Sequence, residues 1–237
     1  MTDLKKYEIL NANTLKIIAL IAMVIDHVGV MIFPNTLWLR CLGRISLPIF
    51  TYMIAEGCRH TKNPTKYFLR IFILGLLCQA VYFAVYGTLY LSTVVSFALS
   101  VLAIQSIDAL IASKSKKALF IHILYCAALL LLMLFLVFPP SFMDRYGLML
   151  DYGIYPFLIP IVLYYLPTKE WRLIAMIPLL YLLSLDFAWE QLLAFCAIPI
   201  LLLYNGKRGK TNLKYFFYIA YPAHLVLIFF VYFLFFR

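Results

Sequence analysis

Charged residues are scarce in this sequence, and acidic residues are scarcer than basic ones. Only 13% of the 237 residues are charged, whereas 65% are hydrophobic. A soluble domain of this length needs far more polar surface to cover itself, so the composition excludes a soluble protein. Ten Asp and Glu stand against twenty Lys and Arg, which leaves a net charge of +10. In so apolar a chain this surplus indicates membrane topology, and no nucleic-acid partner is expected.

The sequence also lacks the short motifs of several enzyme classes. It contains no Walker pattern, GxSxG, zinc signature or Rossmann fingerprint. This argues against a nucleotide-hydrolysing enzyme or a metalloprotease, and no metal site is predicted. The five cysteines have no CxxC spacing, and their odd number argues against a disulfide framework. No cleavable signal peptide is evident before the first apolar run, which is expected to be a retained span.

Long apolar runs recur from one end of the chain to the other. Most of them are long enough to cross a hydrocarbon core of ~30 Å. The predicted fold is therefore an all-α polytopic transmembrane bundle of about nine spans, filling residues 1–237 as a single membrane domain. The predicted spans are 15–33, 41–58, 67–86, 89–111, 118–138, 147–166, 171–187, 189–204 and 214–236.

The basic residues predict which side of the membrane each loop faces. If the N-terminus is cytoplasmic, the loops on that side collect most of the Lys and Arg, from Lys5 and Lys6 to Lys214. The outer side then keeps only Arg40, Arg44, Arg145 and Arg237. Because cytoplasmic loops carry the excess of Lys and Arg, we predict a cytoplasmic N-terminus and an outer C-terminus.

Ionisable residues lie inside the first two predicted spans, among them Asp26, His27, Arg44 and Glu56. Each costs at least about 2.5 kcal/mol on insertion scales, so each requires a reason. Asp26 and Arg44 both fall in the outer half of the membrane, and a buried pair is the cheapest way to keep both charges there. Such a pair could serve only to fix the helix register. His27 suits a general base, or it could be a hydrogen-bonded packing residue.

Further candidates line up along the first and last spans. Lys16 lies eleven residues before His27, so both share one helix face with about 16 Å of depth between them. A cation at the cytoplasmic mouth and a base above it suit a long anionic ligand. His224 is near the middle of the last span, where Pro222 frees the carbonyl of Tyr218. A basic stretch is either a phosphate clamp or simple topogenic charge; it holds Arg59, Lys62, Lys66 and Arg70.

Five segments in order along the chain carry a family resemblance. They are LKIIALIAMVIDHVG, LRCLGRISLPIFTYMIAEGCRHTKNPTKYFLR, DYGIYPFLIP, NGKRG and KYFFYIAYPAHL. This sequence resembles the TraX family, and the IDH and GRxxxPIFxxxxxEG segments are the most specific part of the resemblance. The family's namesake is a bacterial inner-membrane protein of conjugative systems that N-acetylates the amino terminus of the pilin subunit. The family is similar to acyltransferase-3 type membrane enzymes, in which Arg, ten residues and a catalytic His compare with Lys16 and His27 here.

The resemblance implies an acyltransferase with acetyl-CoA as its co-substrate. Acetyl-CoA would enter from the cytoplasm, with its phosphates held by Lys16 and by Arg59, Lys62, Lys66 and Arg70. His27, oriented by Asp26 and Arg44, would deprotonate an amine or hydroxyl acceptor, and His224 would stabilise the oxyanion or assist proton transfer. The implied location is the bacterial inner membrane, among membrane lipids, and the implied acceptor is a peptide such as pilin or an envelope sugar.

Two other classes of function remain open at this point. A proton-coupled small transporter or flippase could use Asp26, Arg44 and His224 as a relay. Against it, the sequence has no convincing internal repeat, and inverted repeats are frequent in such folds. A scaffold for envelope assembly would leave the Asp–His–Arg cluster without a task. Binding of acetyl-CoA separates the enzyme from both alternatives.

Overall fold

The computed structural model describes residues 8–236, which are almost entirely helical. The predicted topogenic residues Lys5, Lys6 and Arg237 lie outside this range. The chain divides into two compact units. The first comprises Met1–Met53 and Leu166–Arg237, and the second comprises Ile54–Tyr165.

The first unit holds the two ends of the described chain. Its helices are α1 (Ala12–Met31), α2 (Leu37–Gly43), the first part of α3 (Ser46–His60), α8 (Lys169–Asp186), η3 (Trp189–Cys196), α9 (Ala197–Leu202) and α10 (Lys214–Phe235). Asn11 starts α1 because its side chain accepts a hydrogen bond from the Thr14 N–H at 3.1 Å. Apolar side chains from these helices form the core, among them Leu15, Ile49 and Leu180.

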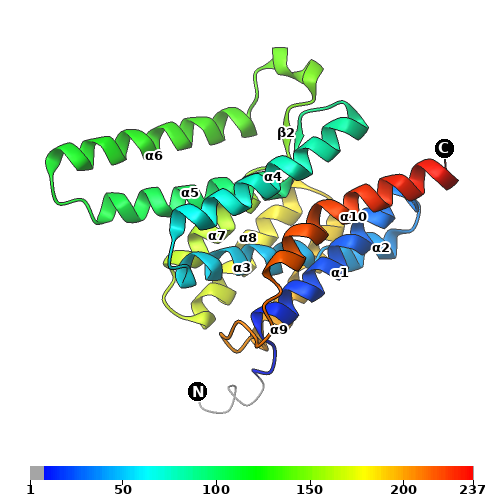
Figure 1. Cartoon of the computed structure of the whole chain (residues 1–237), viewed down its shortest axis with the longest axis horizontal. Coiled ribbons are helices and arrows are strands. Elements are labelled where there is room, and N and C mark those ends of the chain that lie inside the picture. The colour runs from blue at the N-terminus through cyan, green and yellow to red at the C-terminus, as the bar shows by residue number, and fades with distance from the viewer. Residues whose placement is uncertain (1–7, 237) are drawn as a thin grey trace. The chain divides into compact units, whose positions relative to one another are not determined.

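Helices α1 and α10 lie side by side in the first unit (Figure 1). Three contacts follow in the same order along both helices. Lys16 lies over the ring of Phe217, His27 meets His224, and Phe33 packs against Phe236 just beyond the helix ends. The residue numbers rise together, so the two helices run parallel.

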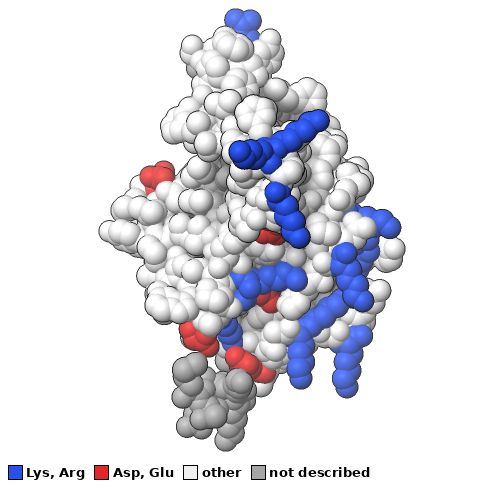
Figure 2. All heavy atoms as spheres, turned by 90° about the vertical axis from the view of Figure 1, so that its left-hand side faces the viewer, with Lys and Arg blue, Asp and Glu red and all other residues white. Residues whose placement is uncertain are grey.

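The second unit contains the most exposed apolar helix of the protein. Its elements are the rest of α3, α4 (Pro64–Tyr86), β1 (Tyr90–Leu91), α5 (Thr93–Ile111), α6 (Lys116–Val137), η2 (Ser141–Tyr146), β2 (Met149–Leu150) and α7 (Tyr155–Tyr165). Of the residues in α6, Met133 is the one that is buried, while most of its large apolar side chains are exposed. A helix with this surface suits contact with lipid and not with water. On the face drawn in Figure 2 most of the surface is uncharged, and the charged side chains are mainly Lys and Arg.

A small two-stranded sheet is an exception to the predicted all-α class. Strands β1 and β2 pair in parallel, with Tyr90 opposite Met149 and Leu91 opposite Leu150. Asp151 follows β2 and accepts hydrogen bonds from the hydroxyl groups of Tyr90 and Thr93. These bonds tie the start of α5 to the strand that precedes α7.

Five helices among residues 8–236 are long and apolar enough to cross a membrane. They are α1, α4, α5, α6 and α10. The protein is therefore a helical membrane protein, and these five agree with the predicted spans 15–33, 67–86, 89–111, 118–138 and 214–236. The predicted span 171–187 coincides with α8, which is helical but is not among the five.

The remaining three predicted spans are not continuous helices. The span 41–58 is divided between α2 and α3, with a turn at Arg44 and Ile45. Pro48 stands in the first turn of α3, where its missing N–H is not needed. In 147–166 only α7 is helical, because β2 and a turn with left-handed Tyr152 and Gly153 come first. The span 189–204 consists of a 3-10 helix followed by the short α9.

Candidate functional site

Two glycines let helix α2 lie directly against α1. A Cβ atom on Gly29 would stand 2.8 Å from the Cβ of Leu39, and one on Gly43 would collide with the side chain of Asp26. Cβ atoms essentially never approach so closely, so larger residues at either position would force the helices apart. This contact brings the residues of α2 within reach of Asp26.

The Asp26 carboxylate is bound by two arginines. Arg44 Nη2 donates to Oδ1, and Arg40 Nη1 donates to Oδ2 at 3.1 Å. Arg44 is 4% exposed and Asp26 is 8% exposed, so this pair is buried, whereas the side chain of Arg40 is 32% exposed. The predicted Asp26–Arg44 pair is present. We call Asp26, Arg40 and Arg44 the Asp26 cluster.

His27 turns toward α10 and meets His224. His27 Nδ1 and His224 Nε2 are 2.8 Å apart, and the rings are inclined by only 13°. The ring centroids are 5.0 Å apart. The centroid separation exceeds the nitrogen–nitrogen distance by about two ring radii. The two nitrogens therefore lie between the ring centres, so the rings meet edge to edge and are joined by a hydrogen bond. Tyr221 packs edge-on against the His224 ring, 6.5 Å between centroids.

The other nitrogen of His224 determines the direction of this hydrogen bond. Its Nδ1 lies 3.1 Å from the carbonyl oxygen of Ala220. A carbonyl oxygen can only accept, so this nitrogen carries the hydrogen. A neutral imidazole has one donor and one acceptor, so His224 Nε2 accepts from His27 Nδ1. The lone pair of a neutral His27 is then on Nε2.

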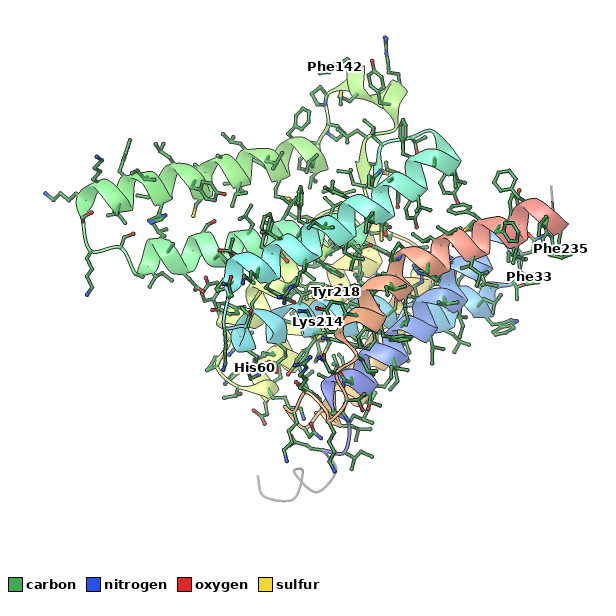
Figure 3. All side chains as sticks on the ribbon, viewed as in Figure 1. Phe33, His60, Phe142, Lys214, Tyr218 and Phe235 are labelled. Carbon is green, nitrogen blue, oxygen red and sulfur yellow. The ribbon has the colours of Figure 1, made fainter. Side chains whose placement is uncertain are left out.

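The basic end of the same helix pair lies about three turns from the histidines. Lys16 is half-buried, and its Nζ lies 5.9 Å from the centre of the Phe217 ring. Figure 3 shows Lys214 and Tyr218 at this end of α10, and Phe235 beside Phe33 at the other end. One end of the α1–α10 pair is thus basic and the other is aromatic.

The other predicted cofactor-binding residues belong to the second unit. Arg59 Nη2 donates to the carbonyl oxygens of Leu163 and Tyr164, and the guanidinium lies 5.4 Å from the Tyr164 ring centre. It therefore caps the last turn of α7. Lys62 just before α4 and Lys66 and Arg70 in its first turns are exposed. Among residues 8–236 no group of three or more His, Cys, Asp or Glu could hold a metal ion.

Sequence reasoning missed two basic residues near these positions. The charge pattern predicts Arg40 only as an outer-side charge, although its spacing of four residues from Arg44 puts both on one helix face. Arg208 lies in the loop before α10, and its carbonyl accepts a hydrogen bond from the Asn13 N–H in the first turn of α1 at 3.2 Å. No sequence periodicity could reveal this contact, because the loop folds back onto α1.

Comparison with known proteins covers the whole of this site. A family model described as "TraX protein" matches residues 11–232. This range includes Lys16, the Asp26 cluster, His27 and His224. "Probable fimbrial assembly protein FimC, serogroup H1" from Dichelobacter nodosus is 29% identical over 252 residues, covering 92% of this chain and 94% of that protein. "Uncharacterized protein RP591" from Rickettsia prowazekii (strain Madrid E) is 36% identical over 67 residues, 28% of this chain and 25% of that protein. No solved structure matches.

Proposed function

The chain belongs to the TraX family, and we propose that it is an integral membrane acyltransferase. In this proposal it moves an acetyl group from cytoplasmic acetyl-CoA to an amine or hydroxyl acceptor at the membrane or its outer face. The observation that carries the proposal is the directed hydrogen bond from His27 to His224. It supplies an oriented base inside an apolar helix pair, as acyl transfer requires.

His27 is the proposed general base, with Nε2 as its reacting nitrogen. Acetyl-CoA supplies an activated thioester. As the acceptor's amine or hydroxyl attacks the acyl carbon, His27 Nε2 takes the proton that the acceptor loses, and it later returns this proton to the departing thiolate sulfur. Both ring nitrogens of His224 are engaged, so it has no N–H left for an oxyanion. His224 is predicted either to stabilise the oxyanion or to assist proton transfer. Because it has no N–H left to donate, we favour assistance in proton transfer, through positioning of His27.

The Asp26 cluster is the proposed electrostatic support of the negative charge that develops beside this base. Asp26 and His27 are consecutive on a helix and point about 100° apart, so the carboxylate serves the arginines and not the imidazole. Arg40 and Arg44 are close enough to act electrostatically on the His27 ring. A fixed positive charge at this position would stabilise negative charge that develops on the acyl oxygen.

The proposed topology is nine spans with a cytoplasmic N-terminus in the bacterial inner membrane. An odd number of spans requires the first and last to run in the same direction, and α1 and α10 are parallel. Their common starting end carries Lys16 and Lys214, which suits the cytoplasmic side. Acetyl-CoA would then reach the helix pair from its basic end.

The acceptor is proposed to be a cell-envelope molecule. The Dichelobacter relative is named as a fimbrial assembly protein. This name supports a pilin peptide as one acceptor, and an envelope sugar remains the other. The proposed chemistry at His27 is the same for an amine and for a hydroxyl.

The test is binding and turnover of radiolabelled acetyl-CoA by the purified full-length protein. We expect saturable binding with slow thioester hydrolysis or self-acetylation, and a loss of turnover by about 10²–10⁴-fold in His27→Ala. The matched control is His122→Ala, a histidine at the start of α6. It is expected to retain the wild-type rate.

Two results would contradict this function. One is a folded His27→Ala or Asp26→Asn variant that transfers acetyl groups at the wild-type rate. The other is a well-folded wild-type preparation that does not bind acetyl-CoA. The second result would favour a proton-coupled transporter, whose activity can be measured as solute-driven proton uptake into vesicles.

A further inference from the structure

The loop before α10 crosses the N-terminal end of α1 as a fixed strap. Its residues 203–213, which we call the strap, are joined to the chain around α1 by backbone hydrogen bonds. Leu10 N–H donates to Leu203 O at 2.9 Å, and Ala12 N–H donates to Lys207 O at 2.8 Å. The side chain of Asn13 adds a bond to Thr211 O at 2.6 Å. Several hydrogen bonds therefore fix the position of the strap on α1.

A glycine is needed where the strap comes closest to α1. Gly209 has a φ of +98°, and a Cβ atom there would stand 2.6 Å from Asn11 Oδ1. Another residue would meet both backbone strain and a steric clash. Asn11 is the N-cap of α1, so Gly209 allows the strap to lie directly on the start of the helix.

The strap does not leave the helix terminus open to an anion. Ala12 and Asn13 N–H groups donate to the strap carbonyls of Lys207 and Arg208, and the Thr14 N–H donates to Asn11 Oδ1. The first backbone donors of α1 are therefore satisfied. Any anion at this end must be held by side chains.

The same contacts bring two cations together. The Arg208 carbonyl accepts a hydrogen bond at 3.2 Å from the N–H of Asn13, which lies one helical turn before Lys16. The Arg208 side chain donates from Nη2 to Asn212 Oδ1 at 2.6 Å. The side chain of Lys16 has no hydrogen bond or ion pair with any residue in the range 8–236, and its Nζ is over the Phe217 ring. The carboxylate of Glu8, which precedes α1, pairs with Lys169 at 2.8 Å. We call Lys16 and Arg208 the Lys16 cluster.

Lys16 is half-buried and Arg208 is exposed, so these two like charges repel each other through partial solvent screening. A dianionic group between them would turn this repulsion into two attractive interactions. Arginine offers a planar fork and lysine a compact point charge, a combination that suits phosphate oxygens. Lys207 and Lys210 belong to the strap and Lys214 begins α10, so this segment carries further positive charge, which favours a group with more than one phosphate.

We propose that the Lys16 cluster is a phosphate-binding site, closed by the strap, for a mono- or diphosphate group at the basic end of the α1–α10 pair. The proposal rests on the proposed function only for the carrier of the phosphate, which is then the acetyl donor. The same chemistry could come from an anionic lipid headgroup. Arg208 is assigned to this site here for the first time, as a binding residue outside the predicted Arg59–Arg70 stretch.

The test uses the full-length protein in detergent, with inorganic pyrophosphate and CoA as separate probes. Binding is measured by titration calorimetry for the wild type and for the variants Arg208→Gln, Lys16→Gln and Lys16→Arg. We expect Kd for both probes to rise roughly 10- to 100-fold in either Gln variant, which is the loss expected for one charged hydrogen bond. Lys16→Arg is expected to stay within a few-fold of the wild type. Lys114→Gln removes an exposed charge from the second unit and is the matched control.

A second arm identifies the source of the phosphate. The Tm of the protein is measured in nanodiscs of phosphatidylcholine and of phosphatidylglycerol. Stabilisation by phosphatidylglycerol that is lost in Arg208→Gln, without binding of CoA, would support the site with a lipid headgroup as its ligand. If pyrophosphate, CoA and phosphatidylglycerol all act equally on the wild type and on both Gln variants, the proposal is overturned.

The arms also separate this site from the proposed acyl transfer. Pyrophosphate binding that depends on Lys16 and Arg208, in a protein that never transfers acetyl groups, would support the site and reject the acyltransferase. Acetyl transfer with an unchanged KM for acetyl-CoA in the folded Arg208→Gln variant, together with unchanged pyrophosphate binding, would reject the site and leave the acyltransferase intact.

Discussion

Helix α1 carries two charge clusters of opposite design. In the Asp26 cluster each carboxylate oxygen has its own arginine, and the two glycines that allow this contact are in place. In the Lys16 cluster, about three turns away, the strap brings the cation Arg208 to the helix turn that precedes Lys16. The first cluster is explained by contacts within the protein, because a carboxylate and a guanidinium stabilise each other. In the second cluster no carboxylate among residues 8–236 plays this part, and the proposed phosphate group would play it. This difference suits a structural role for the Asp26 cluster and a ligand-binding role for the Lys16 cluster on the same helix.

The largest effect is expected from breaking the buried half of the Asp26 cluster. Arg44→Gln leaves Asp26 with only the partly exposed Arg40, and loss of one partner of a buried ion pair costs about 3–5 kcal/mol. The Tm in detergent should fall by roughly 10 °C. Arg40→Gln removes the same charge from the exposed side and should cost under about 1 kcal/mol.

A double variant sharpens this comparison. Asp26→Asn combined with Arg44→Gln removes both charges and should recover part of the lost Tm, since no buried charge is left without a partner. Equal Tm losses in Arg40→Gln and Arg44→Gln would mean that burial does not distinguish the two arginines.

A smaller loss of Tm is expected from substitution of Gly43, the glycine against which the Asp26 side chain packs. Gly43→Ala places a methyl group where the Asp26 side chain lies, and such overpacking costs about 1–3 kcal/mol. We expect a lower Tm and a lower rate of acetyl transfer, because Arg44 moves away from Asp26. Gly87→Ala is the matched control for adding a methyl group, since no atom lies within 4 Å of a Cβ at that position.

Gly87 itself has a φ of +66°, so its variant carries backbone strain without a clash. A transfer rate reduced only in Gly43→Ala would assign the loss to the contact with Asp26. Equal loss in both variants would assign it to general destabilisation.

The sequence predicted the long helices and the buried ion pair, and the reasons are local. Hydrophobicity over about 20 residues predicts a span, and a charge inside a span needs a partner at its own depth. Asp26 and Arg44 could be paired on that ground alone. The pairing of His27 with His224 could not, because it depends on which helix packs against α1, and apolar helix faces do not specify their neighbours.

The interrupted segments were missed for a different reason. The run 41–58 is apolar enough for one span, but its chain turns at Arg44 so that the guanidinium can reach Asp26. Tertiary contact therefore overrides hydrophobicity there. The strap was missed because a basic loop has the same composition whether it is solvated or folded back onto a helix. Its two left-handed glycines, Gly206 and Gly209, were the available sign of a specific conformation.

The smallest effect on stability, and the most specific on chemistry, is expected at His224. The structure orders the hydrogens from His27 Nδ1 through His224 to Ala220, so the wild-type protein should show His27 protonated on Nδ1 and not on Nε2 when both rings are neutral. Ring-¹⁵N labelling distinguishes these tautomers, and with four histidines in the chain the signals can be assigned by His27→Gln and His122→Gln.

His224→Leu removes the acceptor, so His27 should become a mixture of tautomers at a cost of about 1 kcal/mol. If acyl transfer uses Nε2, kcat should fall with KM unchanged, which a merely structural residue would not produce. A His27 that carries its hydrogen on Nε2 in the wild type would contradict this order, and the base would then have to be sought on Nδ1.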